Sequence, residues 1–244
     1  VLMYTEEERK ISFLKTLFDE TYIQDIVGRN RIRNQDEIEE LLNMISSSIG
    51  SLTNPKKLSD TFRSVKGKAI SPVTVKKYLD YLCDAFLIDS AMRYDIRGKK
   101  YINTPLKYYF TDVGLRNARL NFRQLEETHT MENIIYNELR IRDYNVDVGL
   151  VAGTEQNKKG VSVRKQFEVD FVCNKGSKRC YIQAAYAIPD REKLRQEERA
   201  FIKIPDSFKK VIVARDTLSP WYTDAGTLVM NIFDFLLNPG SLDF

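Results

Sequence analysis

The hydrophobic pattern of this chain changes period near residue 87, and that change limits the folds available to it. Before this point apolar residues recur at helical spacing, and after it they alternate as in strands before helices return. A run of helices followed by mixed strands and helices predicts an α/β protein. With 244 residues, 43% of them hydrophobic, the chain can bury one large core or two ordinary ones.

Four helices are predicted before the change of period. The first covers residues 11–27. The second begins after Asn34, which is placed to cap it in a reciprocal pair with Glu37. The third follows the breaker Thr53-Asn54-Pro55, places Leu58, Phe62 and Val65 on one face, and ends at Gly67.

The fourth helix is predicted to begin at Ser71 and Pro72, and its expected buried residues are Val75, Leu79, Leu82 and Phe86. A strand over 87–93, a turn over 95–99 and two returning extended stretches follow it. Three successive helices and a two-stranded wing are the pattern of a winged helix. That fold binds DNA with its third helix and its wing, although winged helices also serve as protein-contact modules.

Positive charge gathers in this region although the whole chain carries a formal net charge of only +4. Residues 56–100 hold eleven Lys or Arg against five Asp, an excess of 11 − 5 = 6. Either these cations face phosphates, or they form an ordinary solvated surface. The predicted nucleic-acid-binding residues are Thr74, Lys76 and Lys77 on the helix and Arg93, Arg97, Lys99 and Lys100 in the wing.

The second half of the chain is expected to fold as a separate α/β domain with a central mixed sheet. Its predicted elements are a helix over 131–142, strands over 145–151, 166–172 and 179–185, a helix over 190–202, strands over 211–214 and 227–230, and a helix over 232–237. Residues 153–160 are predicted to be a polar loop, and Trp221 is expected in another loop. The predicted domains are 1–118 and 119–244.

One helix residue and two strand residues are the candidates for chemistry. Glu132, Asp170 and Gln183 occur in the order that resembles the PD-(D/E)XK nuclease superfamily. The resemblance implies a restriction-endonuclease-like domain in which these residues are catalytic and bind Mg²⁺, with Asp170 and Glu132 as the metal ligands. It also implies a lysine two residues after Gln183, where this chain has Ala185.

Two departures from the nuclease pattern weigh against cleavage. Gln183 is neutral, and alanine at position 185 cannot activate water. Lys165, Lys178 or Tyr186 would have to supply the missing polar group. Without them, Asp170 is an ordinary strand-end carboxylate.

Several motifs together resemble an uncharacterised AAA+ ATPase family of bacteria and archaea. They are the segments 22–27, 87–97, 109–115, 132–133, 137–139, 168–172 and 181–186. The resemblance implies a P-loop ATPase domain upstream, then a winged helix and a nuclease-like domain of unknown function. No Gly-x-x-x-x-Gly-Lys-[Ser/Thr] occurs in this chain, so ATP would act only through that upstream domain.

Three functions therefore remain open at this stage. They are a nucleic-acid-associated binding module with an inactive nuclease-like domain, a weak Mg²⁺-dependent nuclease, and a protein-interaction or oligomerisation scaffold. The expected partners are DNA, the upstream ATPase domain and, for a scaffold, further copies of the chain, with no membrane. A cytoplasmic fragment without disulfides is expected from the three dissimilar cysteines, the start Val1-Leu2-Met3 and the lack of a long apolar run.

Overall fold

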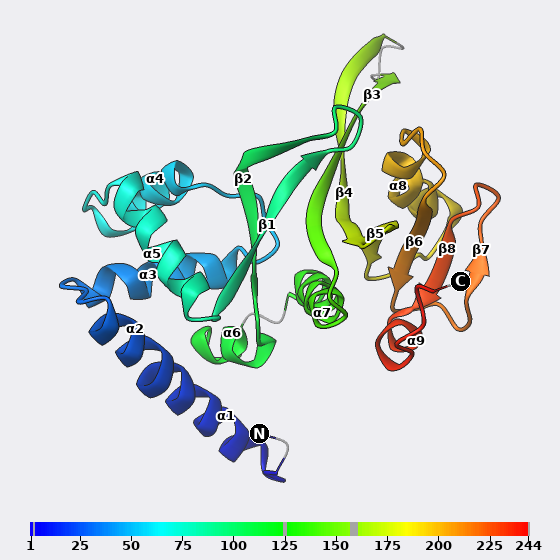
Figure 1. The fold of residues 1–244 in the computed structure, drawn as a ribbon. Helices are drawn as coiled ribbons and strands as arrows, with labels where there is room; N and C mark the ends of the chain where they lie inside the picture. Colours follow the sequence, from blue (N-terminus) through cyan, green and yellow to red (C-terminus); the bar gives the residue numbers. More distant parts are fainter. Residues whose placement is uncertain (2, 124–125, 157–160, 244) are drawn as a thin grey trace. The chain divides into compact units, whose positions relative to one another are not determined.

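The computed structural model describes residues 1, 3–123, 126–156 and 161–243. They form helices and a mixed sheet of eight strands, which confirms the predicted α/β class (Figure 1). The chain divides into two compact units. The first unit comprises Val1–Ser90 and Pro105–Asn133, and the second comprises Ala91–Thr104 and Ile134–Phe244.

A long helix opens the first unit. It consists of α1 (Glu7–Thr16), a π-helical segment η1 (Leu17–Ile23) and α2 (Gln24–Arg29), and Figure 1 shows the three as one continuous rod. The helix predicted over 11–27 is thus confirmed and is longer at both ends. A spacing rule built on 3.6 residues per turn could not distinguish the π-helical segment from the α-helix around it.

The next helix, α3 (Gln35–Ser47), begins where the sequence predicted, but its predicted capping bonds are wrong. The Asn34 side chain makes no capping bond to the helix backbone. Its Nδ2 instead donates to Glu37 Oε1 at 3.1 Å, and the Glu37 backbone N–H donates to the Asn34 carbonyl oxygen at 3.1 Å. The amide and the carboxylate thus pair with each other rather than with backbone N–H groups.

The helix α5 (Pro72–Asp84) begins where predicted, and α4 (Pro55–Lys66) ends at Gly67 as predicted. The predicted breaker at Pro55 is wrong, because α4 begins at this residue, and proline fits a first helical turn. Ser71 Oγ accepts from the Thr74 N–H at 3.0 Å, and Gly67 ends α4 with φ of 66°. Phe86 was expected to be buried, but 77% of it is exposed. Its φ of 54° ends the helical geometry, so helical spacing no longer predicts where the ring points.

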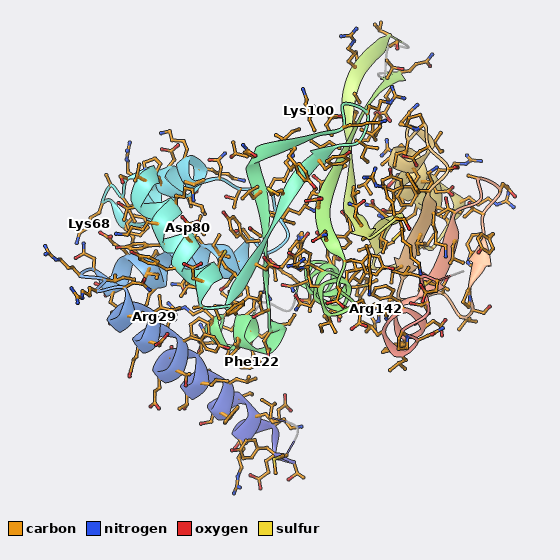
Figure 2. The ribbon with its side chains drawn as sticks, in the orientation of Figure 1. Arg29, Lys68, Asp80, Lys100, Phe122 and Arg142 are labelled. Atoms are coloured by element: carbon orange, nitrogen blue, oxygen red, sulfur yellow. The ribbon has the colours of Figure 1, made fainter. Side chains whose placement is uncertain are left out.

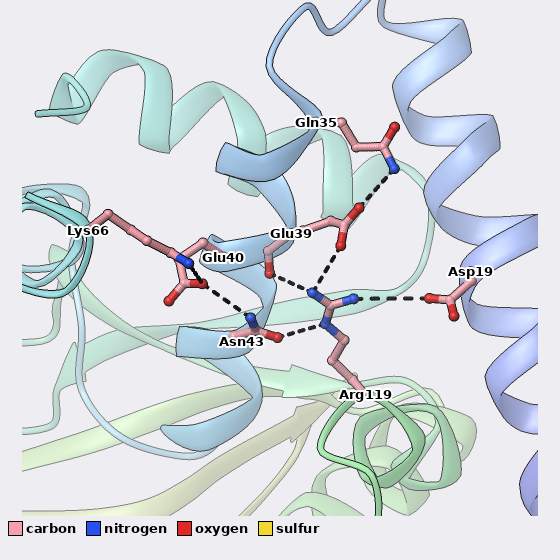
Figure 3. A network of polar contacts seen from close by, with 7 residues as sticks. All are labelled: Asp19, Gln35, Glu39, Glu40, Asn43, Lys66 and Arg119. Atoms are coloured by element: carbon pink, nitrogen blue, oxygen red, sulfur yellow. Dashed lines mark hydrogen bonds and ion pairs between the residues drawn. The ribbon is translucent and has the colours of Figure 1, made fainter. Parts of the chain in front are cut away.

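Arg119 ties three segments of the first unit together (Figure 3). It ends α6 (Val113–Arg119), and its Nε donates to Asn43 Oδ1 at 2.7 Å while Nη2 donates to the Glu39 carbonyl at 3.0 Å, both on α3. Asp19 of the π-helical segment lies 4.0 Å from Nη1. These contacts hold the long helix and α3 against α6.

A hairpin of β1 (Ile88–Asp95) and β2 (Lys100–Phe110) contributes residues to both units. The sequence predicted two separate returning stretches, whereas β2 runs without a break through Pro105. β2 is the first strand in the sheet order β2-β1-β3-β4-β5-β6-β8-β7. An edge strand tolerates a proline because one of its sides needs no N–H donors.

The second unit contains the other strands. Its elements in chain order are the end of α7 (Glu127–Ile141), β3 (Asn145–Gln156), β4 (Ser162–Lys175), β5 (Lys178–Ala185), α8 (Arg191–Ile202), β6 (Lys209–Ala214), β7 (Trp221–Tyr222), β8 (Leu228–Asn231) and α9 (Ile232–Leu237). The strand β4 is antiparallel to both of its neighbours, β3 and β5, and the strands β5, β6 and β8 are parallel.

Two predicted loops in this unit are wrong in part. Gly153–Gln156, expected in a loop, continue β3 and pair with β4 as far as Ser162, while residues 157–160 lie outside the described residues. Trp221, also expected in a loop, forms the short strand β7 with Tyr222. In both places cross-strand pairing extends strand structure into stretches that were predicted from polarity to be loops.

Helices cover the sheet of the second unit with apolar side chains. One buried cluster joins Ala185 of β5 and Ile212 of β6 to Phe201 of α8. Phe171 of β4 packs instead against Tyr136 of α7, with 6.2 Å between ring centroids. Helices from different parts of the chain therefore bury different sets of strand residues.

Arg142, directly after α7, fastens the C-terminal segment of this unit (Figure 2). Its Nη1 donates to Ser241 Oγ at 2.8 Å, and its guanidinium carbon lies 4.7 Å from the centroid of the Phe235 ring on α9. Glu138, one turn earlier, accepts from Nε at 2.8 Å. The planar guanidinium lets one buried side chain hold three groups at once.

A bulge interrupts the pairing of β3 with β4. Asp147 pairs with Val172 and Gly149 pairs with Val169, so β4 has one residue more than β3 over this interval. A Cβ on Gly149 would lie 2.8 Å from Val172 Cγ2 and 2.9 Å from the Val169 Cβ. The absence of a side chain at Gly149 makes room for the bulge.

We expect Gly149→Ala to lower the free energy of unfolding by about 1–3 kcal/mol, because the added methyl group must displace packed strand atoms. Urea unfolding followed by circular dichroism measures this change. Gly28→Ala is the control, since a Cβ at this position in α2 meets nothing within 4 Å. It should raise stability by up to about 1 kcal/mol. An equal effect of the two substitutions would contradict the packing argument.

Candidate functional site

The pairing of β4 with β5 brings together two of the predicted site residues. The Asp170 N–H donates to Gln183 Oε1 at 3.4 Å, and Asp170 Oδ2 accepts from the Ala184 N–H at 2.9 Å. Asp170 is only 8% exposed, and Gln183 is half-buried. Each side chain thus bonds to the backbone of the opposite strand, at the bulge in β4.

The position of the missing lysine lies in apolar surroundings. Ala185 is 2% exposed and belongs to the cluster around Phe201. The two lysines considered as substitutes have other partners: Lys165 pairs with Glu155 at 2.6 Å, and Lys178 pairs with Asp243 at 2.7 Å.

An arginine that the sequence analysis did not consider stands one residue further along the sheet. Ala185 pairs with Ala214 of the parallel strand β6, and the next residues, Tyr186 and Arg215, contact each other. Arg215 Nη1 donates to Tyr186 Oη, and its guanidinium carbon lies 5.0 Å from the centroid of that ring. The sequence could have identified Arg215 as a site residue, because it directly follows the predicted strand over 211–214. The carboxyl ends of parallel strands meet at one edge of a sheet, where ligands commonly bind.

Glu132 makes its polar contacts inside the first unit. Its Oε1 accepts from Lys107 Nζ at 2.9 Å and from Tyr109 Oη at 2.6 Å. The side chains of Lys107 and Glu132 are 5% and 10% exposed. A buried carboxylate with an ammonium partner and a phenol donor is a stable arrangement without any metal.

The residues beside Glu132 complete this arrangement. Asn133 accepts from the Phe110 N–H at 2.8 Å and donates to the Phe110 carbonyl at 2.7 Å, so its amide pairs with the end of β2 as a strand would. Gly50 adopts a positive φ of 69°, and a Cβ there would lie 3.3 Å from both Glu132 carboxylate oxygens. Glu132 and Asn133 therefore join α7 to β2.

The predicted metal ligands belong to different units: Glu132 to the first, and Asp170 to the second. Among the residues that the structure describes, no group of three or more His, Cys, Asp or Glu side chains could hold a metal ion. Asp170 and Gln183 offer one carboxylate and one amide, and Mg²⁺ sites of this kind draw further ligands from water and substrate phosphates. Binding of Mg²⁺ by Asp170 and Glu132 stays a prediction.

The predicted DNA-contacting residues of α5 lie on the surface of the first unit. Thr74 Oγ1 lies 2.8 Å from Ser71 Oγ at the start of the helix. Lys76 is 66% exposed at its side chain and pairs with Asp80 at 2.7 Å, while Lys77 Nζ lies 5.6 Å from the Tyr81 ring. Exposed pairs of this kind are weak, so these lysines can exchange their partners for a phosphate.

The predicted wing residues belong to the second unit. Lys99 and Lys100 are exposed at the turn of the hairpin, and Figure 2 labels Lys100. Arg97 differs, because its Nε and Nη2 donate to the Lys203 carbonyl at 3.3 and 3.0 Å, just beyond α8. Arg93 is half-buried, and its Nε has no hydrogen-bond partner among the described residues.

A buried carboxyl anchors the same hairpin to β3. Asp147, 6% exposed, accepts a 3.3 Å hydrogen bond from Tyr101 Oη. Burial raises the pKa of the Asp147 carboxyl, and the bond from Tyr101 only partly opposes this. Burial and the nearby Asp147 carboxylate raise the pKa of Tyr101 in turn. Arg97 and Tyr101 therefore serve first to hold the hairpin turn.

Within the described residues, the structure contains no helix that is long and apolar enough to cross a membrane. The chain is similar to an uncharacterized protein of Haemophilus influenzae, with 30% identity over 236 residues, which are 97% of this chain and 54% of that protein. It is also similar to an uncharacterized protein of Methanocaldococcus jannaschii, with 28% identity over 196 residues, which are 80% of this chain and 41% of that protein.

The chain thus spans about half the length of the curated relatives that it matches, one bacterial and one archaeal. A family model described as a domain of unknown function, DUF8612, matches residues 1–126, more than half of the 244 residues. The chain therefore belongs to the uncharacterised DUF8612 family.

Proposed function

We propose that this chain is a nucleic-acid-associated binding module of a longer protein, with a winged-helix-like first unit and a nuclease-like second unit that does not cleave. The observation that carries the proposal is the environment of Ala185. This residue lies in an apolar cluster beside a strand pair that otherwise keeps Asp170 and Gln183 together.

The order of elements supports the two fold assignments. The helices α3, α4 and α5 of the first unit precede the β1–β2 hairpin, which contributes residues to both units, in the order of the helices and wing of a winged helix. From α7 to β6 the order is a helix, three antiparallel strands, a helix and a strand parallel to β5. That order suits a nuclease-like domain with Asp170 on its second strand and Gln183 on its third.

The chemistry around Asp170 favours binding over hydrolysis. Cleavage of a phosphodiester needs a metal-bound or activated water and a cation close to the developing charge. Position 185 is occupied by a buried methyl group, and Lys165 and Lys178 are paired with other carboxylates. Arg215 lies beside Tyr186, and a guanidinium is suited to bind an anion but cannot act as the base that activates water.

Exposed cations support a nucleic-acid partner. Lys77 on α5 and both Lys99 and Lys100 at the hairpin turn are exposed to solvent. Such lysines bind phosphates without reading sequence, and their contribution weakens as salt rises. The relatives are about twice as long as this chain. We therefore also propose that an ATPase domain in the longer protein drives the module, as the resemblance to AAA+ proteins implies.

The double substitution Lys99→Ala/Lys100→Ala should weaken duplex DNA binding equally across sequences. If both lysines contact phosphates, the slope of log affinity against log salt concentration should fall by about 2, since each phosphate contact contributes about 0.9. Fluorescence anisotropy of labelled duplexes over a salt series measures both quantities.

Arg191→Ala/Arg195→Ala is the matched control for that measurement. It removes the same charge from exposed positions of α8 in the same unit. An equal loss in both double variants would indicate attraction by total charge alone. No binding by the unaltered chain at low salt, together with a defined oligomer, would favour a scaffold instead.

Supercoiled plasmid should stay intact when the unaltered chain is incubated with it and Mg²⁺, because the position of the lysine that would activate water is occupied by the buried Ala185. Agarose gel electrophoresis detects a single nick per plasmid. Asp170→Asn is the comparison variant, since it removes the carboxylate charge and keeps the shape of the side chain. If the unaltered chain nicks the plasmid and Asp170→Asn abolishes the nicking, the proposal is overturned in favour of a weak nuclease.

Introducing the missing lysine should damage the fold. We expect Ala185→Lys to lower the free energy of unfolding by about 3 kcal/mol or more, because an ammonium group would enter the apolar cluster around Phe201. Ala187→Lys, at a half-buried position after β5, should change it by less than about 0.5 kcal/mol. Equal urea midpoints for the two variants would mean that position 185 admits a lysine after all.

A further inference from the structure

Two cysteines face each other on neighbouring strands of the second unit. Cys173 of β4 and Cys180 of β5 are partners in the strand register, on either side of the turn at Gly176. They are 0% and 4% exposed, and both are free thiols. The third cysteine, Cys83, lies on α5 in the first unit.

The two thiols interact directly and differ in acidity. The hydrogen bond from the Cys173 thiol lowers the pKa of the Cys180 thiol, and the Lys209 ammonium lowers it further against the opposing effect of burial. Burial raises the pKa of the Cys173 thiol. Cys180 therefore carries the nucleophilic sulfur of the pair, and Cys173 is the thiol beside it.

A cavity of about 250 Å³ gives access to Cys180. Its lining includes Cys180 together with Tyr144, Lys178, Phe208, Lys209 and Asp243. The Lys209 ammonium lowers the pKa of the Cys180 thiol, and a cation beside a thiol favours the thiolate that reacts with oxidants. The cavity volume exceeds the roughly 30 Å³ that a water molecule occupies in the liquid, so a peroxide molecule also fits.

We propose that Cys173 and Cys180 form a redox-active dithiol, which hydrogen peroxide oxidises reversibly to a cross-strand disulfide. The Cys180 thiolate attacks one peroxide oxygen, the O–O bond breaks, and protonation releases water and leaves a sulfenic acid on Cys180. The Cys173 sulfur then attacks the Cys180 sulfur, forms the S–S bond and expels the hydroxyl group as a second water. Two thiols are oxidised, one peroxide is reduced, and two waters form.

The strand geometry permits this bond. Directly opposed residues in an antiparallel pair have Cα atoms about 4.5–5.5 Å apart, and disulfides span about 4.4–6.8 Å. The same two strands carry Asp170 and Gln183, each three residues from a cysteine. The cross-link would therefore fix the register of the strand pair that holds the candidate site.

The test is the response of the full 244-residue chain to hydrogen peroxide. After treatment, denaturation with a maleimide and intact mass measurement should show one labelled thiol and the loss of two hydrogens, where the untreated chain shows three labelled thiols. Peptide mapping should find the residues 173 and 180 linked, and dithiothreitol should restore three labels. Cys83 serves as the internal reference, because burial raises the pKa of its thiol to about 12.

Variants separate the two steps. Cys173→Ser should stop the reaction at a sulfenic acid on Cys180 that dimedone traps, and Cys83→Ser should leave the disulfide unchanged. Lys209→Gln should raise the pKa of the Cys180 thiol and so slow its oxidation. A rise of one pKa unit lowers the thiolate fraction about tenfold, but the remaining thiolate is about threefold more nucleophilic, so the rate should fall about threefold.

Three labelled thiols after peroxide, or linkage only between chains, would overturn the proposal. Because the mass of the unaltered chain alone decides it, a variant that fails to fold does not affect the result.

Discussion

The bulge of β4 against Gly149 is the constraint on which the second unit depends. One extra residue in β4 shifts the alternation of its side chains, so Val169 and Val172 both join the cluster under α8 while Phe171 packs against Tyr136. The bulge lies where Asp170 meets Gln183, and their side chains bond to the backbone of the opposite strand there. A regular strand would place Asp170 differently.

Several cations of the chain are already engaged with another group of the structure. Lys107 neutralises Glu132, Arg142 holds the C-terminal segment, and Lys165 pairs with Glu155. A cation that is already paired in this way is poorly suited to stabilise negative charge that develops during a reaction. To do so it would have to leave its present partner unpaired. Within the described part of the chain, no hydrogen bond or ion pair engages the side chains of the exposed Lys99 and Lys100, and binding of phosphates needs only such solvated cations.

Periodicity predicted the helices of the first unit because each buries a single apolar stripe between clear start and stop residues. The secondary-structure and burial predictions failed where pairing with a neighbouring strand, or a change of backbone direction, decides whether a residue is strand or is buried. Gly153–Gln156 are strand because β4 continues beside them, and Phe86 is exposed because its positive φ follows the end of α5. The pairing of Cys173 with Cys180 depends on the two-residue turn at 176–177, because a turn over 174–177 would set Cys173 opposite Lys178 instead. The register beyond the bulge, by contrast, depends on the one extra residue of β4, which no local pattern marks.

Glu132 shows how one sequence signature can have two physical explanations. In a nuclease, a helix glutamate of this kind would contribute a metal ligand. In this chain its carboxylate accepts bonds from Lys107 and Tyr109, and Gly50 leaves room for it by lacking a side chain. Asn133 adds two bonds to the backbone of Phe110, so the pair joins α7 to β2 whether or not any metal binds. Packing and hydrogen bonding alone are therefore enough to explain a glutamate at position 132, and Glu132 by itself does not indicate a metal site.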